Sequence, residues 1–335
     1  MRILTQSDVQ RLLSMRDCID VMSSALAALA GGNAQMPLRT VMRIPDSSDM
    51  FGVMPGYLGD PRTIGAKIIT VFPGNHGTER DSHQGAVLLF DDTTGTLAAV
   101  VDATAITTTR TAAVSAVATR LLARADASSL AIIGAGVQAH AHLEAMLAVR
   151  PIARLRVWSR NRDHAAALVR AATDRFRLEA AVADTGAEAV RDAHIVCTTT
   201  SASSPVLEGA WLAPGTHVNA VGACTPNARE LDSEVVRRAR LYVDRRDAAL
   251  AEPGDILVPL REGVITPSHV IAELGALLLP GADVATLGRQ RDTDITLFES
   301  LGLAVEDLAA ARWVLDRAEG ANAGTVVALG GVRAN

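Results

Sequence analysis

Three basic side chains in the first third of the chain could together hold an acidic ligand. Arg39 follows Met-Pro-Leu, Lys67 starts an apolar run, and Arg110 begins a segment with helical character. A cation at a helix N-terminus opposes the helix dipole, so Arg110 needs a compensating charge, which a bound anion could supply. Each cation alone is more often a surface residue. As a set they could clamp a carboxylate, which arginine binds through two parallel hydrogen bonds.

Two further side chains could line a ligand site. His83 precedes the apolar run at 86–90, so it could face the same cleft or occupy a polar turn. Cys224 stands in Val221-Gly-Ala-Cys-Thr-Pro226 with no base spaced to activate its thiol. A thiol has a reference pKa of about 8.5 and is mostly neutral at pH 7, which favours a packing role over a nucleophile.

A glycine turn near the middle of the chain has the form expected of a dinucleotide site. Gly134-Ala-Gly-Val-Gln-Ala139 follows an apolar run and opens a helix-like segment. Gly134 permits the tight turn, Gly136 leaves room for a pyrophosphate, and the small third position allows close helix packing. The first turn of the helix, with Val137 and Gln138, would present N–H groups to the phosphates. A turn with only a structural role is the alternative, but the run Leu155-Arg-Val-Trp158 completes a β-α-β unit.

The residues after that second run indicate which coenzyme would bind. A site for NAD usually has Asp or Glu there, to accept from the ribose 2′-hydroxyl. This chain has Ser159, Arg160 and Asn161 instead. The charge and donors of Arg160 suit a 2′-phosphate, so we expect a preference for NADP(H), with NAD(H) as the alternative. Arg160 as a solvated loop residue is the competing interpretation.

The hydrophobic pattern predicts the elements that must position these residues. Apolar spacing favours helices over 7–31, 109–123 and 305–318, and short β-runs with turns occupy 37–101. From residue 130 the pattern alternates between strand and helix, as in a doubly wound parallel sheet, and 246–300 is less regular. The strands are expected at 130–133, 155–159, 178–183, 194–199, 217–222 and 240–244.

Composition excludes several classes of protein. The 335 residues suffice for one large or two ordinary domains, and 49% hydrophobic residues provide an ample core. A formal net charge of −5 without a basic block argues against a nucleic-acid partner, and charges interrupt the apolar stretches before they reach membrane-spanning length. Three widely spaced cysteines and an N-terminus without an apolar signal core favour the cytoplasm. No ligand spacing typical of a metal site is present.

Taken together, these motifs resemble the ornithine cyclodeaminase/mu-crystallin family over nearly the whole chain. The likeness is greater to the mu-crystallin-like ketimine reductases than to the cyclodeaminases. The matching blocks are Pro37-Leu-Arg-Thr40, Gly52-Val-Met-Pro-Gly-Tyr57, His83-Gln-Gly-Ala-Val-Leu-Leu-Phe90, Ile106 to Ser115, Gly134 to Ala139, Asn219-Ala-Val-Gly-Ala223, Arg229-Glu-Leu-Asp232, Tyr242-Val-Asp244 and Phe298 to Asp307.

The resemblance implies an α/β fold in which a Rossmann doubly wound domain (121–304) is inserted into an α+β substrate-binding and dimerisation domain (1–120 plus 305–335). It also implies a homodimer. The substrate carboxylate would be held by Arg39, Lys67 and Arg110, with His83 and Cys224 near the substrate. The coenzyme would be held by Gly134, Gly136, Val137, Gln138, Ser159, Arg160, Asn161, Thr198, Thr199, Thr200, Val221 and Gly222.

One departure from the family pattern bears on the activity. Cyclodeaminases carry an aspartate where this chain has Cys224, and a neutral thiol supplies no fixed negative charge for the substrate amine. The resemblance therefore implies an NADPH-dependent reductase of a small 2-imino acid, such as 1-pyrroline-2-carboxylate or 1-piperideine-2-carboxylate. Lys67 is a candidate proton donor if Arg39 and Arg110 lower its pKa. The alternatives are an alanine-type amino-acid dehydrogenase, an ornithine cyclodeaminase, and a non-catalytic protein that binds NADPH and a small carboxylate.

Overall fold

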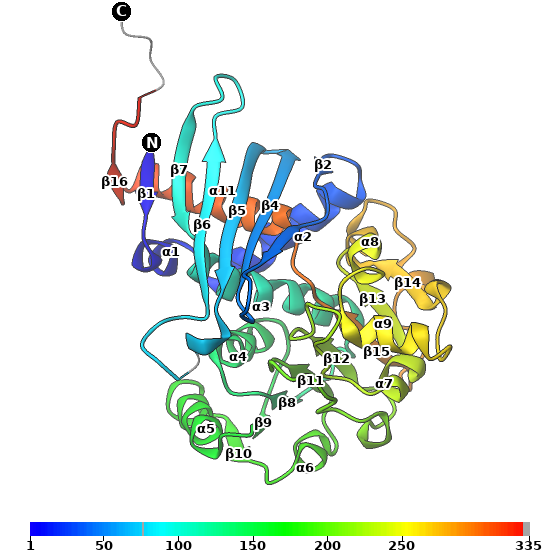
Figure 1. Cartoon of the computed structure of the whole chain (residues 1–335). Helices are drawn as coiled ribbons and strands as arrows, with labels where there is room; N and C mark the ends of the chain where they lie inside the picture. Colours follow the sequence, from blue (N-terminus) through cyan, green and yellow to red (C-terminus); the bar gives the residue numbers. More distant parts are fainter. Residues whose placement is uncertain (76, 331–335) are drawn as a thin grey trace, which may run out of the picture. The chain divides into compact units, whose positions relative to one another are not determined.

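The computed structural model describes residues 1–75 and 77–330, which form two compact units (Figure 1). The first unit comprises Met1–Arg110 and the chain from Leu303 onward, and the second is Thr111–Gly302. The chain enters the second unit within helix α3 (Ala103–Leu122) and returns to the first just before the last helix. The fold is α/β, as the sequence predicts. Among the described helices, none is both long enough and apolar enough to cross a bilayer.

The first unit is built on a mixed sheet in the order β16-β1-β7-β6-β5-β4-β2, with β3 paired to β4. Helix α11 packs on the central strands β4, β5 and β6 and also against α2 (Figure 1). Its elements are β1 (Arg2–Leu4), α1 (Gln6–Leu12), α2 (Met15–Ala30), β2 (Ala34–Gln35), β3 (Thr40–Arg43), β4 (Met50–Gly59), β5 (Arg62–Val71), β6 (His83–Phe90), β7 (Leu97–Asp102), α11 (Ala304–Gly320) and β16 (Thr325–Val326).

The second unit contains a parallel sheet in the order β10-β9-β8-β11-β12-β15-β13-β14. The strand order reverses between β8 and β11, and ligands bind at such switch points in doubly wound folds. Its elements are β8 (Ser129–Ile133), α4 (Val137–Val149), β9 (Arg154–Trp158), α5 (Arg162–Phe176), β10 (Glu179–Val182), α6 (Gly186–Val190), β11 (Ile195–Thr198), β12 (His217–Ala220), α7 (Ser233–Arg238), β13 (Ala239–Val243), α8 (Arg246–Ala249), α9 (Gly254–Arg261), β14 (Val270–Glu273), α10 (Val284–Leu287) and β15 (Ile295–Glu299).

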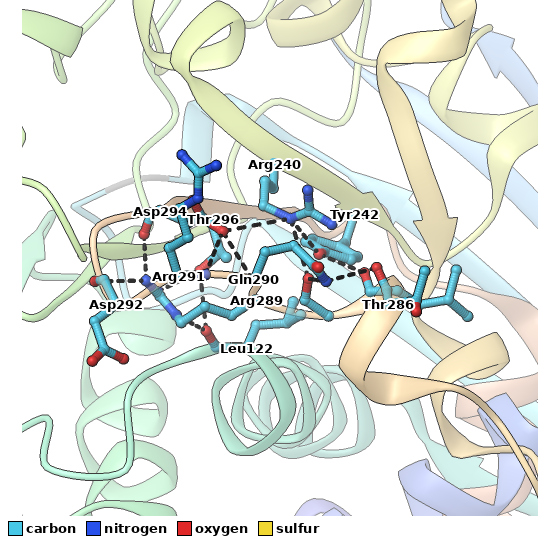
Figure 2. A network of polar contacts seen from close by, with 12 residues as sticks. Leu122, Arg240, Tyr242, Thr286, Arg289, Gln290, Arg291, Asp292, Asp294 and Thr296 are labelled. Carbon is cyan, nitrogen blue, oxygen red and sulfur yellow. Dashed lines mark hydrogen bonds and ion pairs between the residues drawn. The ribbon is translucent and has the colours of Figure 1, made fainter.

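A polar network fixes the C-terminal end of α3 within the second unit. Figure 2 shows Arg289, whose guanidinium donates to the Leu122 carbonyl at 2.8 Å and to the Thr296 hydroxyl at 3.0 Å. Thr296 lies on β15, and its hydroxyl also donates to the Leu122 carbonyl at 3.3 Å. The last carbonyl groups of a helix have no partner within the helix, so these bonds satisfy them and join α3 to the sheet.

All six strands expected between residues 130 and 244 are present, but other expectations about the elements are wrong. The expected helix over 7–31 is two helices, because the Ser14 hydroxyl accepts from Asp17 N–H and caps a new helix at Met15. Helix α3 begins at Ala103 rather than 109, with the Asp102 carboxylate accepting from Ala105 N–H at 2.8 Å. The less regular region holds two strands, β14 and β15, that the sequence pattern does not indicate.

Candidate functional site

The glycine turn lies at the switch point of the parallel sheet. Gly134 follows β8 with φ +110°, a left-handed conformation that side chains disfavour. A Cβ at Gly134 would lie 2.8 Å from both the carbonyl oxygen and the hydroxyl of Thr199, which follows β11. Thr199 N–H in turn donates to the Ile133 carbonyl at 2.8 Å. Close approach of these two loops therefore requires glycine at position 134.

Gly136 leaves open space at the start of α4, where a phosphate would bind. It is the N-cap residue, no side chain caps the helix there, and a Cβ at Gly136 would meet no atom within 4 Å. Val137 is 57% exposed at the first helical position, whereas Ala139 is fully buried against the sheet. Backbone N–H groups, the helix dipole and the absence of a side chain fit the pyrophosphate of a dinucleotide.

Of the three residues after β9, Asn161 and Ser159 make local hydrogen bonds, whereas Arg160 is exposed to solvent. The Asn161 side-chain oxygen accepts from the N–H groups of Asp163 at 3.0 Å and His164 at 3.2 Å, so it caps α5. The hydroxyl of Ser159 accepts from Asn161 N–H at 3.3 Å, and the side chain is half-buried. Arg160 is exposed between them.

The buried carboxylate of Glu230 connects the ends of strands β11 and β12. The sequence analysis did not assign this residue to the site. Glu230 accepts hydrogen bonds from the end of β11, from the loop that follows it and from the loop that follows β12, and its side chain is inaccessible to solvent. The donors are Thr198 Oγ1 at 2.8 Å, Thr200 N at 2.5 Å, Thr200 Oγ1 at 2.7 Å, Val221 N at 3.3 Å and Gly222 N at 2.7 Å. Five expected coenzyme residues therefore lie at the carboxyl ends of two neighbouring strands: Thr198, Thr199, Thr200, Val221 and Gly222.

The first unit brings together two of the three predicted cations in a buried ionic cluster. Lys67 Nζ lies 2.8 Å from a carboxylate oxygen of Asp307, and Arg110 Nε lies 3.0 Å from the other. Arg110 Nη1 also contacts Glu306 at 2.8 Å. These four side chains are at most 4% exposed. Two cations and two carboxylates leave this cluster electrically neutral.

The sequence analysis placed Arg110 at a helix N-terminus, where a bound anion would have to compensate its charge. That expectation is wrong. Arg110 lies in the middle of α3, away from its N-terminus, and the first turn of α11 supplies Glu306 and Asp307 as counter-charges. The sequence carried a signal for this, since Glu-Asp opens the last apolar helix within one of the family blocks. The sequence analysis assigned these two acidic residues no role, because their distant partners are not visible in the sequence.

Arg39 adds a further positive charge near Lys67. Burial, together with the positive charges of Arg110 and Arg39, lowers the pKa of Lys67 to about 8, although the attraction of Asp307 opposes this shift. Arg39 is half-buried and precedes β3. Burial alone would raise the pKa of Asp307, but Arg110 and Lys67 outweigh it and hold that pKa below its usual value.

The two remaining candidates differ in their surroundings. His83 is exposed and, instead of preceding a strand, is the first residue of β6, where its ring nitrogen Nδ1 pairs with the Ser82 hydroxyl at 3.0 Å. Cys224 is half-buried after β12, and its thiol donates to the Val221 carbonyl at 3.4 Å. Neither contact indicates a nucleophile.

The model of the ornithine cyclodeaminase/mu-crystallin family matches residues 1–322. The chain belongs to this family. Ketimine reductase mu-crystallin from Mus musculus is 40% identical over 317 residues, 93% of this chain and 96% of that protein. The structure of Thermococcus litoralis Δ1-pyrroline-2-carboxylate reductase with NADH and L-proline has a TM-score of 0.93 at 37% identity, covering 98% of this chain and all (100%) of that one.

A second solved structure shares the fold. An archaeal alanine dehydrogenase dimer with bound NAD has a TM-score of 0.91 at 33% identity, covering 98% of this chain and 99% of that one. The family resemblance predicted from the motifs is thus confirmed.

Proposed function

We propose that this protein is an NAD(P)H-dependent reductase of small cyclic 2-imino acids, such as 1-pyrroline-2-carboxylate or 1-piperideine-2-carboxylate. The observation that carries the proposal is the buried Lys67–Arg110–Asp307 cluster with Arg39 beside it, in a chain that also has an open glycine turn for a dinucleotide. The relatives named as ketimine reductase and pyrroline-2-carboxylate reductase support the same chemistry.

In this proposal the cluster binds and polarises the substrate. Arg39 and Arg110 hold the carboxylate, and the charge of Arg110 is kept in place by Glu306 and Asp307. The Lys67 ammonium donates a hydrogen bond to the substrate and is the proton source for the nitrogen, because its pKa of about 8 makes it a stronger acid than an ordinary lysine. When bound, the reduced nicotinamide supplies the hydride that converts the C=N carbon to CH–NH.

The proposed coenzyme preference is for NADP(H). Support comes from the exposed Arg160 and from the Ser159 hydroxyl at a position where NAD-binding proteins usually place a carboxylate. The solved relatives hold NADH or NAD, so NAD(H) remains the alternative that the measurement must compare.

Substrate turnover distinguishes the proposal from its rivals. Purified protein is incubated with NADPH or NADH and, in separate assays, with each cyclic imine or with pyruvate plus ammonia, and loss of the absorbance of the reduced nicotinamide measures turnover. A further assay measures ammonia release from ornithine. We expect oxidation of the coenzyme with the two cyclic imines and little with pyruvate plus ammonia. Faster turnover of pyruvate plus ammonia would indicate an alanine-type dehydrogenase. Ammonia release from ornithine without net coenzyme oxidation would indicate a cyclodeaminase, and binding without any turnover a non-catalytic role.

We also propose a homodimer formed through the first unit. Side chains that alternate with the buried ones on β4, β5 and β6 give the sheet a second apolar face, on which Ile64 is 43% and Phe90 36% exposed. Ile64 lies directly opposite Phe90, and Ile68 opposite Val53. A contiguous apolar surface of this kind is typical of an interface. The three free cysteines support a cytoplasmic location for the assembly.

A further inference from the structure

We propose that Glu230 is a positioning residue of the coenzyme site, whose carboxylate locks together the two loops that follow β11 and β12. This inference rests on the proposed coenzyme-dependent function. One loop begins at Thr199, directly after Thr198 ends β11, and the other at Val221, and both leave the same edge of the sheet as the glycine turn. Their shape therefore determines the surface on which the coenzyme lies beyond its pyrophosphate.

The contacts of Glu230 are divided between the two loops. One carboxylate oxygen accepts from the N–H and the hydroxyl of Thr200, at 2.5 and 2.7 Å. The other accepts from the Thr198 hydroxyl at 2.8 Å and from Gly222 N–H at 2.7 Å. Each oxygen accepts from a backbone N–H group, of Thr200 or of Gly222, and such a group can only donate, so both oxygens must act as acceptors. Hydrogen bonds of this charge-assisted kind are roughly twice as strong as neutral ones.

The backbone of Glu230 is fixed as firmly as its side chain. An oxygen of Asp255, in the first turn of α9, accepts from the N–H groups of Glu230 and Leu231, both at 2.9 Å. The Glu230 carbonyl accepts from Val206 N–H at 2.7 Å and Leu207 N–H at 3.0 Å. Glu230 thus has little freedom to move away from the loops. Asp255 acts through it without touching either loop in any contact seen here.

The loops have no room to rearrange around a different side chain. A Cβ at Gly222 would lie 1.9 Å from the Thr200 carbonyl and 2.7 Å from the Glu230 carboxyl carbon. Glycine at position 222 therefore allows the second loop to lie directly against the first, with the carboxylate between them. A glutamine at position 230 would turn an –NH₂ group toward backbone or hydroxyl donors, which leaves at least one buried donor unsatisfied.

A second buried carboxyl in the same unit provides a matched control. Glu299 ends β15, is fully buried, and in the described structure neither of its carboxyl oxygens has a hydrogen-bond partner. Burial, followed by repulsion from Asp255, Cys224, Glu230 and Asp244, raises its pKa well above the usual value, which favours the neutral form of the carboxyl group. The described residues contain no cluster of acidic, histidine or cysteine side chains arranged for a metal ion. Glutamine has nearly the same size and shape and is a close substitute for a carboxyl group whose neutral form is favoured.

The two glutamine variants separate positioning from general stability. The dissociation constants of NADPH and NADH are measured by fluorescence titration for the wild-type protein, Glu230→Gln and Glu299→Gln, with thermal unfolding as the check on folding. We expect Glu230→Gln to raise the coenzyme dissociation constant and coenzyme KM at least tenfold, with the imine KM changed less than threefold. In Glu299→Gln, the coenzyme dissociation constant, the coenzyme KM and the imine KM should all stay within twofold of the wild-type values.

The inference is overturned if folded Glu230→Gln binds coenzyme within twofold of wild type, or if Glu299→Gln weakens binding as much. If Glu230→Gln does not fold, the variants Thr198→Val and Thr200→Val decide, since each removes one hydroxyl contact at nearly constant volume. A threefold or larger rise in the coenzyme dissociation constant in either supports the inference, and unchanged binding in both overturns it. Failure of the proposed function would appear in the wild-type protein itself, as absent imine turnover, whereas failure of this inference appears only in the variants.

Discussion

Lys67 is the residue whose ionisation the proposed reaction depends on most directly. With a pKa of about 8, it is protonated below that pH and loses its proton above it. We therefore predict that kcat/KM for imine reduction is level below pH 8 and falls up to tenfold per unit above it. Lys67→Met should lower the rate and abolish the fall of kcat/KM above pH 8. If the fall persists in Lys67→Met, it reflects ionisation of the imine or of another group, and Lys67 is not the proton donor.

Arg39 is a cleaner test of carboxylate binding than Arg110. Removing Arg110 leaves Glu306 and Asp307 buried with one cation fewer, which typically destabilises a protein by about 3–5 kcal/mol. Arg39 is only half-buried, so Arg39→Met should fold normally. We expect it to raise the imine KM by roughly ten- to a hundredfold, the loss of about one to two charge-assisted hydrogen bonds, and to leave NADPH affinity unchanged. Steady-state kinetics and coenzyme titration check both, and an unchanged imine KM would remove Arg39 from the site.

Ser159 and Arg160 determine the predicted coenzyme preference. Ser159→Asp places a carboxylate where it can accept from a ribose 2′-hydroxyl and repel a 2′-phosphate. We expect the ratio of NADPH to NADH affinity to fall at least tenfold, with Arg160→Gln as a second variant that lowers only NADPH affinity. Titration of each variant with both coenzymes measures this ratio. A ratio unchanged in both variants would show that the 2′-position is recognised elsewhere.

Residue types were easier to predict from sequence than their partners. The glycine turn follows from local rules, since a strand, two glycines and a helix are adjacent in the chain. Lys67 and Arg110 could be selected as a pair of cations, but their counter-charges lie about two hundred residues away, at Glu306 and Asp307. Glu230 was visible only as part of a family block. Its role requires knowing that the loops after β11 and β12 are neighbours, which is a property of the sheet order.

At the scale of elements, α3 depends on side chains from outside its own sequence. Arg150, at the C-terminal end of α4, donates to the carbonyl groups of Thr119 at 2.8 Å, Ala123 at 2.9 Å and Arg124 at 2.9 Å. Lysine has a single ammonium group instead of the planar, forked guanidinium, so it cannot bond to all three carbonyl groups at once. We predict that Arg150→Lys lowers the free energy of unfolding by about 1–3 kcal/mol, because carbonyl groups become unsatisfied.

Calorimetry or denaturant unfolding measures the effect of Arg150→Lys. The matched control is Arg175→Lys on α5, where the arginine is largely exposed and pairs with Glu144 at 3.4 Å. Exposed ion pairs contribute little, so this control should change stability by less than about 0.5 kcal/mol. Equal effects in the two variants would contradict the capping role of Arg150.

Helix and strand boundaries show where local propensity gives way to packing. The start of α3 contains several threonines, which lower helix propensity and led to a predicted start six residues late. In the structure Ala103, Ala105 and Ile106 are buried, and this burial together with the Asp102 cap extends the helix. Strands β14 and β15 are short and separated by irregular chain, and their partners in the sheet come from other segments. Such strands are defined by pairing, which a single sequence does not display.

At the scale of the whole molecule, the second face of the first unit's sheet is the surface through which we propose that the protein forms a dimer. We predict that the double variant Ile64→Lys/Phe90→Lys converts a dimer into a monomer, because two ammonium groups would be buried without partners in an interface formed by this face. Light scattering after size-exclusion chromatography measures the mass directly. The control is Val284→Lys, an exposed apolar residue of the second unit that should leave the mass unchanged. A double variant that keeps the wild-type dimer mass would place the interface on another surface, while a wild-type monomer would mean that this apolar face serves a different partner or none.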